Sequence, residues 1–448
     1  MTPKHRVVII GNGIAGATVA EILGKKRDFV ITMISDECNL PYARTALMYV
    51  FMDQVRWADT LLQSEDFWKN LPIEMITDRV SHLDRIQKIL DLESGRKIEY
   101  DTLVIATGSK PILPNLDGTM SDHVHVLYHL TDLEKMNRQL CQKPQKAVIV
   151  GGGLIGIEMA EMWLSKGMEV NLLIRDDSFW KSSLPVQESR LVQSHISCKG
   201  INVICSDTLS SIIYNNNKLT SVQTSQGRSI PCDMLGIAIG VEPNVGWLQK
   251  SGLALNRGIL VDPFLKTNDD AIFAAGDCVE LNGPETQNRV EAIWHTAKKM
   301  GEVVAQNIMG TGRPYDAGIH YNGARFFDIE YQMYGQMSMA PIKNESHYFW
   351  QHPNENCSLR LAFDEYQQLT GILSLGIRLR KTVCDHWIKH QAPLQQVLSE
   401  IGAAHYDVEF SANRLSNMVA KMQVITKNNY EGLYQDTINN DVHESKKS

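Results

Sequence analysis

The 448-residue sequence predicts an α/β protein with two units of similar sequence pattern and a C-terminal α+β domain. The first observation is that an apolar run, at 7–10 and again at 147–150, is followed by a glycine-rich turn and an apolar helical pattern. A second strand-like run follows each turn, as in a βαβ unit with parallel strands. From about residue 321, aromatic β-rich stretches precede a helical pattern at 393–401, which indicates a further domain.

The two turns share one glycine pattern, G-x-G-x-x-G. It is formed by Gly11, Gly13 and Gly16 in the first unit, and by Gly151, Gly153 and Gly156 in the second. Between a strand and a helix, such glycines let the backbone approach a pyrophosphate at the positive end of the helix. One match alone would be weak, but two in the same chain predict two bound dinucleotides.

The remaining strands are predicted from apolar runs and turn residues. The runs at 29–35 and 169–174 complete the two βαβ units, and those at 80–83, 88–92 and 97–100 read as an antiparallel meander. Further buried strands are expected at 102–106, 235–240 and 271–275, the last ending in Gly276 and Asp277. The polar stretch 428–448 lacks periodicity and is expected to form a flexible tail.

Composition excludes several classes of protein. The 44 basic and 51 acidic residues give a net charge of −7, which argues against a general nucleic-acid binder. No apolar run is long enough for a transmembrane segment, and no secretory signal is recognised at the N-terminus. The eight cysteines form no C-x-x-C pair, so no metal site, iron-sulfur cluster or disulfide framework is predicted, and a cytoplasmic location is expected.

Taken together, the motifs of residues 5–320 resemble the two-dinucleotide-binding flavoproteins of the pyridine nucleotide-disulfide oxidoreductase superfamily. The stretch 40–47 is similar to the Pro-Tyr-x-Arg-x-x-Leu motif of the rubredoxin and ferredoxin reductase branch, and so is the pattern at 291–301. The resemblance implies two Rossmann-like domains that bind FAD and NAD(P)H, the second inserted in the first. The FAD domain would be 1–113 and 244–320, the NAD(P)H domain 114–243, the C-terminal α+β or interface domain 321–427, and the tail 428–448.

The resemblance also implies the site residues. Glu158 is the expected catalytic residue, and the expected cofactor-binding residues are Gly11, Gly13, Gly16, Asp36, Glu37, Arg44, Val80, Thr107, Gly108, Gly151, Gly153, Gly156, Arg175, Lys181, Gly240, Gly276, Asp277 and Trp294. A carboxylate of Asp36 or Glu37 can accept the ribose hydroxyls of FAD, although both acids also suit a surface loop. The carboxylate of Asp277 can hydrogen-bond the ribityl chain of FAD, and it can equally cap a helix N-terminus. Arg44 can point at the flavin or its phosphates, or it can be an ordinary exposed arginine.

The preference between NADH and NADPH rests on the end of the second βαβ unit. Arg175 and Lys181 are placed for the 2′-phosphate of NADPH, whereas Asp176 and Asp177 would suit a ribose hydroxyl or repel a phosphate. Taken together, these four residues slightly favour NADPH over NADH.

Two departures from related families matter. The C-x(4)-C pair of glutathione reductase-type enzymes is absent, and Cys38 comes too soon after its strand to match the single-cysteine branch, so a structural thiol is expected. Tyr49 stands where the ferredoxin reductase branch has a lysine paired with the residue at Glu158.

The resemblance implies an FAD-dependent NAD(P)H oxidoreductase that passes electrons to a ferredoxin- or rubredoxin-like carrier. An NAD(P)H oxidase or a quinone or dye reductase is the alternative within the same class. A redox-sensing scaffold similar to apoptosis-inducing factor is the alternative of another class. The aromatic stretch 321–334 suits the protein core or a homodimer interface better than a substrate platform.

Overall fold

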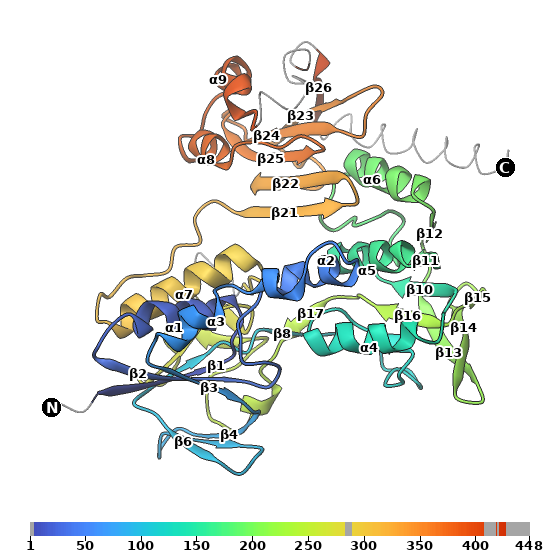
Figure 1. Cartoon of the computed structure of the whole chain (residues 1–448). Coiled ribbons are helices and arrows are strands. Elements are labelled where there is room, and N and C mark those ends of the chain that lie inside the picture. The colour runs from blue at the N-terminus through green and yellow to red at the C-terminus, as the bar shows by residue number, and fades with distance from the viewer. Residues whose placement is uncertain (1–3, 283–288, 407–417, 419–420, 427–448) are drawn as a thin grey trace. The chain divides into compact units, whose positions relative to one another are not determined.

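The computed structural model describes residues 4–282, 289–406, 418 and 421–426 (Figure 1). The chain forms two compact units. The first unit comprises Met1–Pro144 and Gly236–Ala317, and the second comprises Gln145–Leu235 and Gly318–Ser448. The expected flexible tail at 428–448 lies outside the described residues. Among those that are described, no helix has the length and apolar character needed to cross a membrane.

A five-stranded parallel sheet forms the centre of the first unit. Its strand order is β19-β7-β1-β2-β3, with β1 at His5–Ile10, β2 at Phe29–Ser35, β3 at Ile73–Thr77, β7 at Thr102–Ile105 and β19 at Ile272–Ala274. The apolar run at the end of β1 is buried because helices or loops cover both faces of a parallel sheet. The predicted strand at 29–35 is confirmed residue by residue.

The helices of the first unit are α1 (Ile14–Gly24), α2 (Leu47–Phe51), α3 (Glu65–Lys69), α4 (Leu130–Leu140) and α7 (Trp294–Ile308). Helix α1 packs closely against α7, and Gly301 makes that approach possible. A Cβ atom at Gly301 would lie 2.5 Å from the carbonyl oxygen of Ala15. Any larger residue would push the two helices apart.

Most of the remaining strands of the first unit form small sheets. β4 (Val80–Asp84), β5 (Ile89–Leu92) and β6 (Lys97–Glu99) form the antiparallel meander, as predicted. β8 (Ser109–Pro111) pairs antiparallel with β17 (Val241–Pro243). β18 (Ile259–Val261) pairs parallel with β20 (Val279–Leu281). The short strand β9 spans Val124–His125.

The second unit contains the second βαβ segment. Strands β12, β11, β10 and β16 are neighbours in that order, with β10 at Lys146–Val150, β11 at Glu169–Leu173, β12 at Ile201–Ile204 and β16 at Met234–Ile237. Helix α5 (Leu154–Ser165) connects β10 to β11, and α6 (Val186–Cys198) precedes β12. An antiparallel sheet follows, made of β13 (Leu209–Asn215), β14 (Lys218–Thr224) and β15 (Ser229–Pro231).

A six-stranded antiparallel sheet forms the C-terminal part of the second unit, drawn in orange to red in Figure 1. Its order is β21-β22-β25-β24-β23-β26, with β21 at Tyr321–Phe326, β22 at Ile329–Gly335, β23 at Ser346–Gln351, β24 at Ser358–Phe363, β25 at Leu369–Leu375 and β26 at Gln423–Thr426. Helices α8 (Lys381–Lys389) and α9 (Leu394–Glu400) complete the predicted α+β region. Phe326, Tyr331 and Tyr334 are buried, so this aromatic stretch contributes to the protein core.

A buried ion pair joins α6 to β24 within the second unit. Arg360 and Glu188 are both fully buried, and two hydrogen bonds of 2.7 and 2.9 Å connect them. The Arg360 guanidinium also donates to Gln187 and lies 4.7 Å from the ring centroid of Phe349. Breaking such a pair would leave a buried charge uncompensated, so these two elements stabilise each other.

Candidate dinucleotide-binding sites

The first glycine turn, between β1 and α1, has the geometry of a phosphate cradle. Gly11 has φ +102°, and a Cβ atom there would lie 2.1 Å from the carbonyl oxygen of Ala106. A Cβ atom at Gly16 would lie 2.0 Å from the carbonyl oxygen of Gly11. By contrast, nothing lies within 4 Å of a Cβ atom at Gly13, the N-cap residue of α1, and no side chain caps this helix. An open, uncapped helix N-terminus suits a pyrophosphate.

The side chain of Asn12 ties this turn to the loop after β2. Its Nδ2 donates to the carbonyl oxygen of Cys38 over 2.6 Å. The Cys38 thiol in turn donates to the carbonyl oxygen of Leu40. Burial and the charge of Glu37 raise the pKa of Cys38, so this thiol lacks the activation of a redox nucleophile.

The two acids after β2 have different surroundings. Asp36 is exposed and forms an ion pair of 2.9 Å with Arg79. The Glu37 side chain is only 3% exposed and forms an ion pair of 2.7 Å with Arg44. Its carboxylate also accepts hydrogen bonds from the Tyr42 hydroxyl and the Leu130 amide.

The Glu37 carboxylate is held ionised by these partners. Burial opposes ionisation, but the hydrogen bonds from His129, Tyr42 and Leu130 and the charge of Arg44 lower its pKa to about 2. Glu37 therefore links the loop after β2 to the N-terminus of α4, where Leu130 is the first residue. Whether it also contacts a ribose stays a prediction.

Arg44 lies between two aromatic rings. Its guanidinium carbon is 5.2 Å from the ring centroids of both Tyr42 and Tyr128, and it donates to the carbonyl oxygen of Tyr128. The ion pair with Glu37 and the two cation–π contacts fix the guanidinium in place. Arg44 is thus an ordered, partly buried group of the first unit.

Asp277 lies beside the strand ends of the first sheet. Its carboxylate accepts a hydrogen bond of 2.9 Å from the Ser109 hydroxyl. Burial raises the pKa of Asp277, and the Ser109 hydrogen bond opposes this effect. Gly276, with φ +83°, makes the turn that brings Asp277 there, and Gly108 has φ +64° in the neighbouring turn. This carboxylate and the uncapped start of α1 belong to the same unit and fit the ribityl and phosphate groups of FAD.

Four other predicted residues belong to the first unit. Thr107 donates its hydroxyl to the carbonyl oxygen of Asn244 over 2.9 Å. Val80 is buried in the meander, opposite Leu92. Gly240 has φ +126° before β17, and Trp294 is the first residue of α7. Their contact with a cofactor stays a prediction.

The second glycine turn, between β10 and α5, repeats the first. Gly151 has φ +122°, and its amide donates to the carbonyl oxygen of Leu173 in the neighbouring strand. Nothing lies within 4 Å of a Cβ atom at Gly153, which is the N-cap residue of α5, and no side chain caps this helix. Gly156 is buried in the first turn of α5. The second unit therefore presents an equivalent cradle.

Glu158 lies on α5, near the second glycine turn. Burial raises its pKa to about 7, and the charge of Glu161 adds to the effect. Within the described part of the chain, no hydrogen bond or ion pair is formed by the Glu158 carboxylate. A carboxyl group of this kind gains or loses a proton near neutral pH, which is typical of functional sites.

The two cations expected to select NADPH lie at the surface of the second unit. The Arg175 side chain is 81% exposed and lies 3.5 Å from the Asp176 carboxylate. Lys181 forms an ion pair of 2.6 Å with Asp177. Each cation thus has an acid beside it, and both acids would oppose a phosphate.

The fold and the two cradles define a protein built to bind two dinucleotides. The profile of the pyridine nucleotide-disulphide oxidoreductase family matches residues 5–301. The chain belongs to this family, as the sequence motifs predicted. Membership implies FAD and NAD(P)H as cofactors, and the residues of the two cradles fit them. The eight cysteines all lie in the described part of the chain, and none of them forms a disulfide there.

Characterised relatives include electron-transfer enzymes. The chain is 29% identical over 311 residues to the assimilatory nitrate reductase electron transfer subunit of Bacillus subtilis, covering 68% of this chain and 39% of that protein. It therefore spans well under half the length of this relative. It is 27% identical over 384 residues to the NADH-rubredoxin oxidoreductase of Clostridium acetobutylicum, covering 84% of this chain and 94% of that protein.

A solved structure shows the same fold. A ferredoxin reductase from Rhodopseudomonas palustris superposes with a TM-score of 0.76 at 27% identity, covering 83% of this chain and 91% of that one. The predicted α/β class with two Rossmann-like units is thereby confirmed.

Proposed function

We propose that this protein is an FAD-dependent NAD(P)H oxidoreductase that passes electrons to a small ferredoxin- or rubredoxin-like carrier protein. The observation that carries the proposal is the pair of open, uncapped helix N-termini at Gly13 and Gly153, one in each unit. FAD, when bound, supplies the chemistry that accepts a hydride and releases electrons one at a time. The names of the rubredoxin and ferredoxin reductases among the relatives support the choice of acceptor.

In this proposal, the first unit holds FAD. The backbone amides that follow Gly13 bind the pyrophosphate, while Asp277 and Ser109 orient the ribityl chain. Asp36 is the acid whose carboxylate is exposed enough to accept ribose hydroxyls. Glu37 and Arg44 fix the loop that begins at Asp36, and thereby position the acid.

The second unit holds the nicotinamide nucleotide. The turn at 151–156 binds its pyrophosphate, and Arg175 or Asp176 distinguishes a 2′-phosphate from a hydroxyl. Glu158 retains or releases a proton near neutral pH and so tunes the charge near the start of α5. The domain boundaries that we propose are 1–113 with 244–320 for FAD, 114–243 for the nucleotide, and 321–427 for the α+β or interface domain.

We also propose a cytoplasmic location, which eight cysteines without a disulfide among them support. A homodimer through the 321–427 region remains part of the proposal. An oxidase and a quinone reductase share the first half of the reaction and differ only in the acceptor.

A steady-state assay in which each electron acceptor is supplied on its own tests the proposed function. Purified protein is reduced with NADH or NADPH, and reoxidation is followed with a ferredoxin, a rubredoxin, a quinone and oxygen. We expect rapid flavin reduction and much faster reoxidation by one of the carrier proteins. Fast reoxidation by oxygen alone would identify an oxidase. Slow reduction with a long-lived reduced complex would instead identify a redox sensor.

A further inference from the structure

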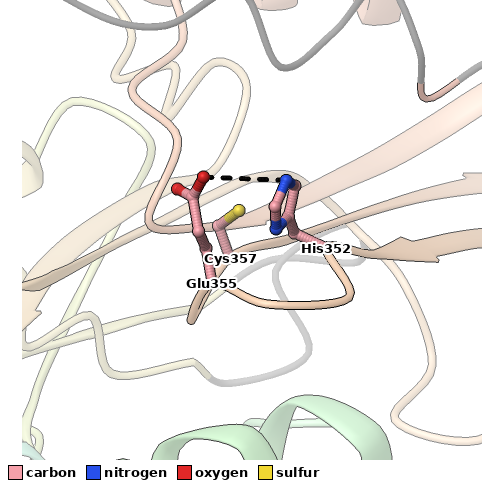
Figure 2. Close-up of side chains that lie close together, drawn as sticks. All are labelled: His352, Glu355 and Cys357. Carbon is pink, nitrogen blue, oxygen red and sulfur yellow. Dashed lines mark ion pairs between the residues drawn. The ribbon is translucent and has the colours of Figure 1, made fainter.

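We propose that the loop between β23 and β24 binds one thiophilic divalent cation, with zinc as the best match, through His352, Glu355 and Cys357. One ligand atom from each residue lies within 4.8 Å of the others. Figure 2 shows the imidazole, the carboxylate and the thiol gathered on one side of this loop. The proposal is independent of the electron-transfer function, because it concerns only the C-terminal sheet of the second unit.

The backbone places His352 and Cys357 opposite one another. Gln351 pairs with Ser358 at the end of the β23–β24 ladder. His352 and Cys357 extend this ladder by one position, since the His352 amide donates to the Cys357 carbonyl over 3.0 Å. Residues opposite each other in an antiparallel pair project to the same face, about 5 Å apart at Cβ. The hairpin geometry, rather than chance, therefore brings the imidazole and the thiol together.

Glu355 completes the set from the turn of the same hairpin. The Cys357 amide donates to the Glu355 carbonyl over 2.8 Å, which holds the turn closed. The Glu355 carboxylate lies 3.6 Å from Nε2 of His352, the contact drawn as a dashed line in Figure 2. In a tetrahedral zinc site, nitrogen and oxygen ligands at about 2.0–2.2 Å from the metal are about 3.4 Å apart. The 3.6 Å between the Glu355 carboxylate and Nε2 of His352 is close to this separation.

The donor types favour zinc over a hard cation. A thiolate, an imidazole and a carboxylate are ligands that zinc accepts together, whereas calcium and magnesium prefer oxygen alone. A thiolate and a carboxylate also supply two negative charges for a divalent ion. Cys357 is 2% exposed, while the side chains of His352 and Glu355 are 25% and 41% exposed. The sulfur thus lies at the buried end, and water can supply a fourth ligand at the exposed end.

A hydrogen bond of His352 within the loop must change when a metal binds. Nδ1 of His352 accepts a bond of 3.2 Å from the Asn354 amide. Coordination through Nε2 puts the imidazole proton on Nδ1, so this bond is lost. On the other side of the loop, the Asn356 amide donates 2.8 Å to Nδ1 of His195 and anchors the loop to α6.

A second pair of histidines in the same unit requires a control. His386 and His390 are exposed and four residues apart at the C-terminal end of α8, where His390 is the C-cap residue, and their ring centroids are 4.2 Å apart. Two histidines at this spacing can bind a transition metal at the surface without any thiol. A His386→Gln/His390→Gln background removes that contribution.

The experiment measures metal binding by the full-length, tag-free, FAD-loaded protein in this background. Protein whose cysteine thiols have been reduced is dialysed against limiting Zn²⁺. The amount of bound zinc per bound flavin is then measured by mass spectrometry. We expect about one zinc ion per chain. Cys357→Ser, His352→Gln and Glu355→Gln should each weaken binding at least about tenfold, since even loss of an outer hydrogen bond to a ligand costs that much. The exposed thiol variant Cys198→Ser is the matched control and should bind zinc normally.

Co²⁺ provides a second readout, because a thiolate-bound, four-coordinate Co²⁺ ion has strong absorption to the red of the flavin bands. We expect this absorption in the parent and its loss in Cys357→Ser. His352→Gln and Glu355→Gln are partly exposed substitutions, so they decide the question if Cys357→Ser fails to fold. Zinc binding that is unchanged in these two variants, or absent in the parent, would overturn the proposal.

Discussion

The two glycine turns are nearly the same in backbone and differ in the side chains that come directly after the second strand of each unit. Both begin with a glycine at positive φ, and both leave an open glycine as the N-cap of an uncapped helix. After β2, however, the Glu37 side chain is 3% exposed in an ion pair, whereas after β11 the Arg175 side chain is 81% exposed. In both units, the shape of the glycine turn is thus set by the local backbone and not by side chains.

The strongest test of this equivalence replaces each of the two open glycines by glutamate, one at a time. Gly13→Glu places a carboxylate where the pyrophosphate of FAD is expected, at a position where a Cβ atom meets no protein atom within 4 Å. We expect the flavin content to fall to roughly a tenth or less, because like charges repel strongly where water is excluded. Gly153→Glu should keep the flavin and lose reduction by NAD(P)H. Flavin absorbance per chain and stopped-flow reduction measure the two effects.

The matched comparisons are Gly13→Ala and Gly153→Ala, which add an uncharged methyl group that meets no protein atom within 4 Å. Because the backbone is expected to approach the pyrophosphate closely at these glycines, alanine should weaken binding, but less than glutamate does. A Gly13→Glu protein with its full complement of FAD would show that the first turn does not hold the pyrophosphate.

The buried acid of the first unit should matter for stability. Glu37→Gln removes the charge that Arg44 pairs with, and we expect a loss of about 3 kcal/mol in the free energy of unfolding. Urea unfolding in excess FAD, followed by flavin fluorescence, measures it. The exposed ion pair of the neighbouring acid supplies the control through its other member: Arg79→Gln should cost at most about 1 kcal/mol. Equal costs for both substitutions would contradict the difference in burial.

The exposed cation of the second unit should affect specificity instead. Arg175→Ala should raise the apparent KM for NADPH by roughly one to two decades, at about 1.5–3 kcal/mol for a charged hydrogen bond, and scarcely change that for NADH. Stopped-flow reduction with each nucleotide tests this. A parent that prefers NADH, with Arg175→Ala indifferent to both, would show that Asp176 binds the ribose.

A smaller effect, on the pH dependence of flavin reduction, is expected from a side-chain difference between the two helices that begin at the glycine turns. Glu158 is the fifth residue of α5, and its counterpart in α1 is Thr18, whose hydroxyl donates to the Ile14 carbonyl over 2.7 Å. Because the pKa of Glu158 is raised to about 7, its carboxyl is neutral below that pH and charged above it. We expect the flavin reduction rate to change several-fold across about pH 7 in the parent. Glu158→Gln should flatten this profile, and Thr18→Val should retain it.

The smallest expected effect is that of Cys38→Ser. Its thiol pKa is raised, and none of the eight cysteines, all within the described residues, forms a disulfide. NAD(P)H-driven dye reduction should stay within a few-fold of the parent. Activity that collapses while flavin remains bound would point to a redox-active thiol.

Local signals account for the features that the sequence predicted well. The glycine turns, the strand β2 and the meander depend on residues within a few positions of each other, and the structure confirms them. The ion pair between Glu37 and Arg44 is also close in sequence, but its partners His129 and Leu130 are not. No sequence pattern indicated that α4 would supply them.

The contact between Arg360 and Glu188 shows the same limit, since 172 positions separate the two residues. One signal was available: Arg360 is the only charged residue in strand β24, and apolar residues lie on both sides of it. A cation in such a strand requires a buried partner, although its position does not identify which one. The His352, Glu355 and Cys357 set was missed because their spacing fits no common metal motif, and only the hairpin register brings them together.

The Arg360–Glu188 pair also has a consequence for how this chain can evolve. A recombination event that replaced the segment after residue 318 with one lacking an arginine at this position would strand an ionised glutamate inside α6. The reverse exchange, of the βαβ segment alone, would leave a guanidinium without its counter-ion. The two halves of the second unit must therefore be inherited together or change in a compensated order. A chimera that takes both 145–235 and 318–448 from one parent should therefore be more stable than a chimera that takes only one of these segments.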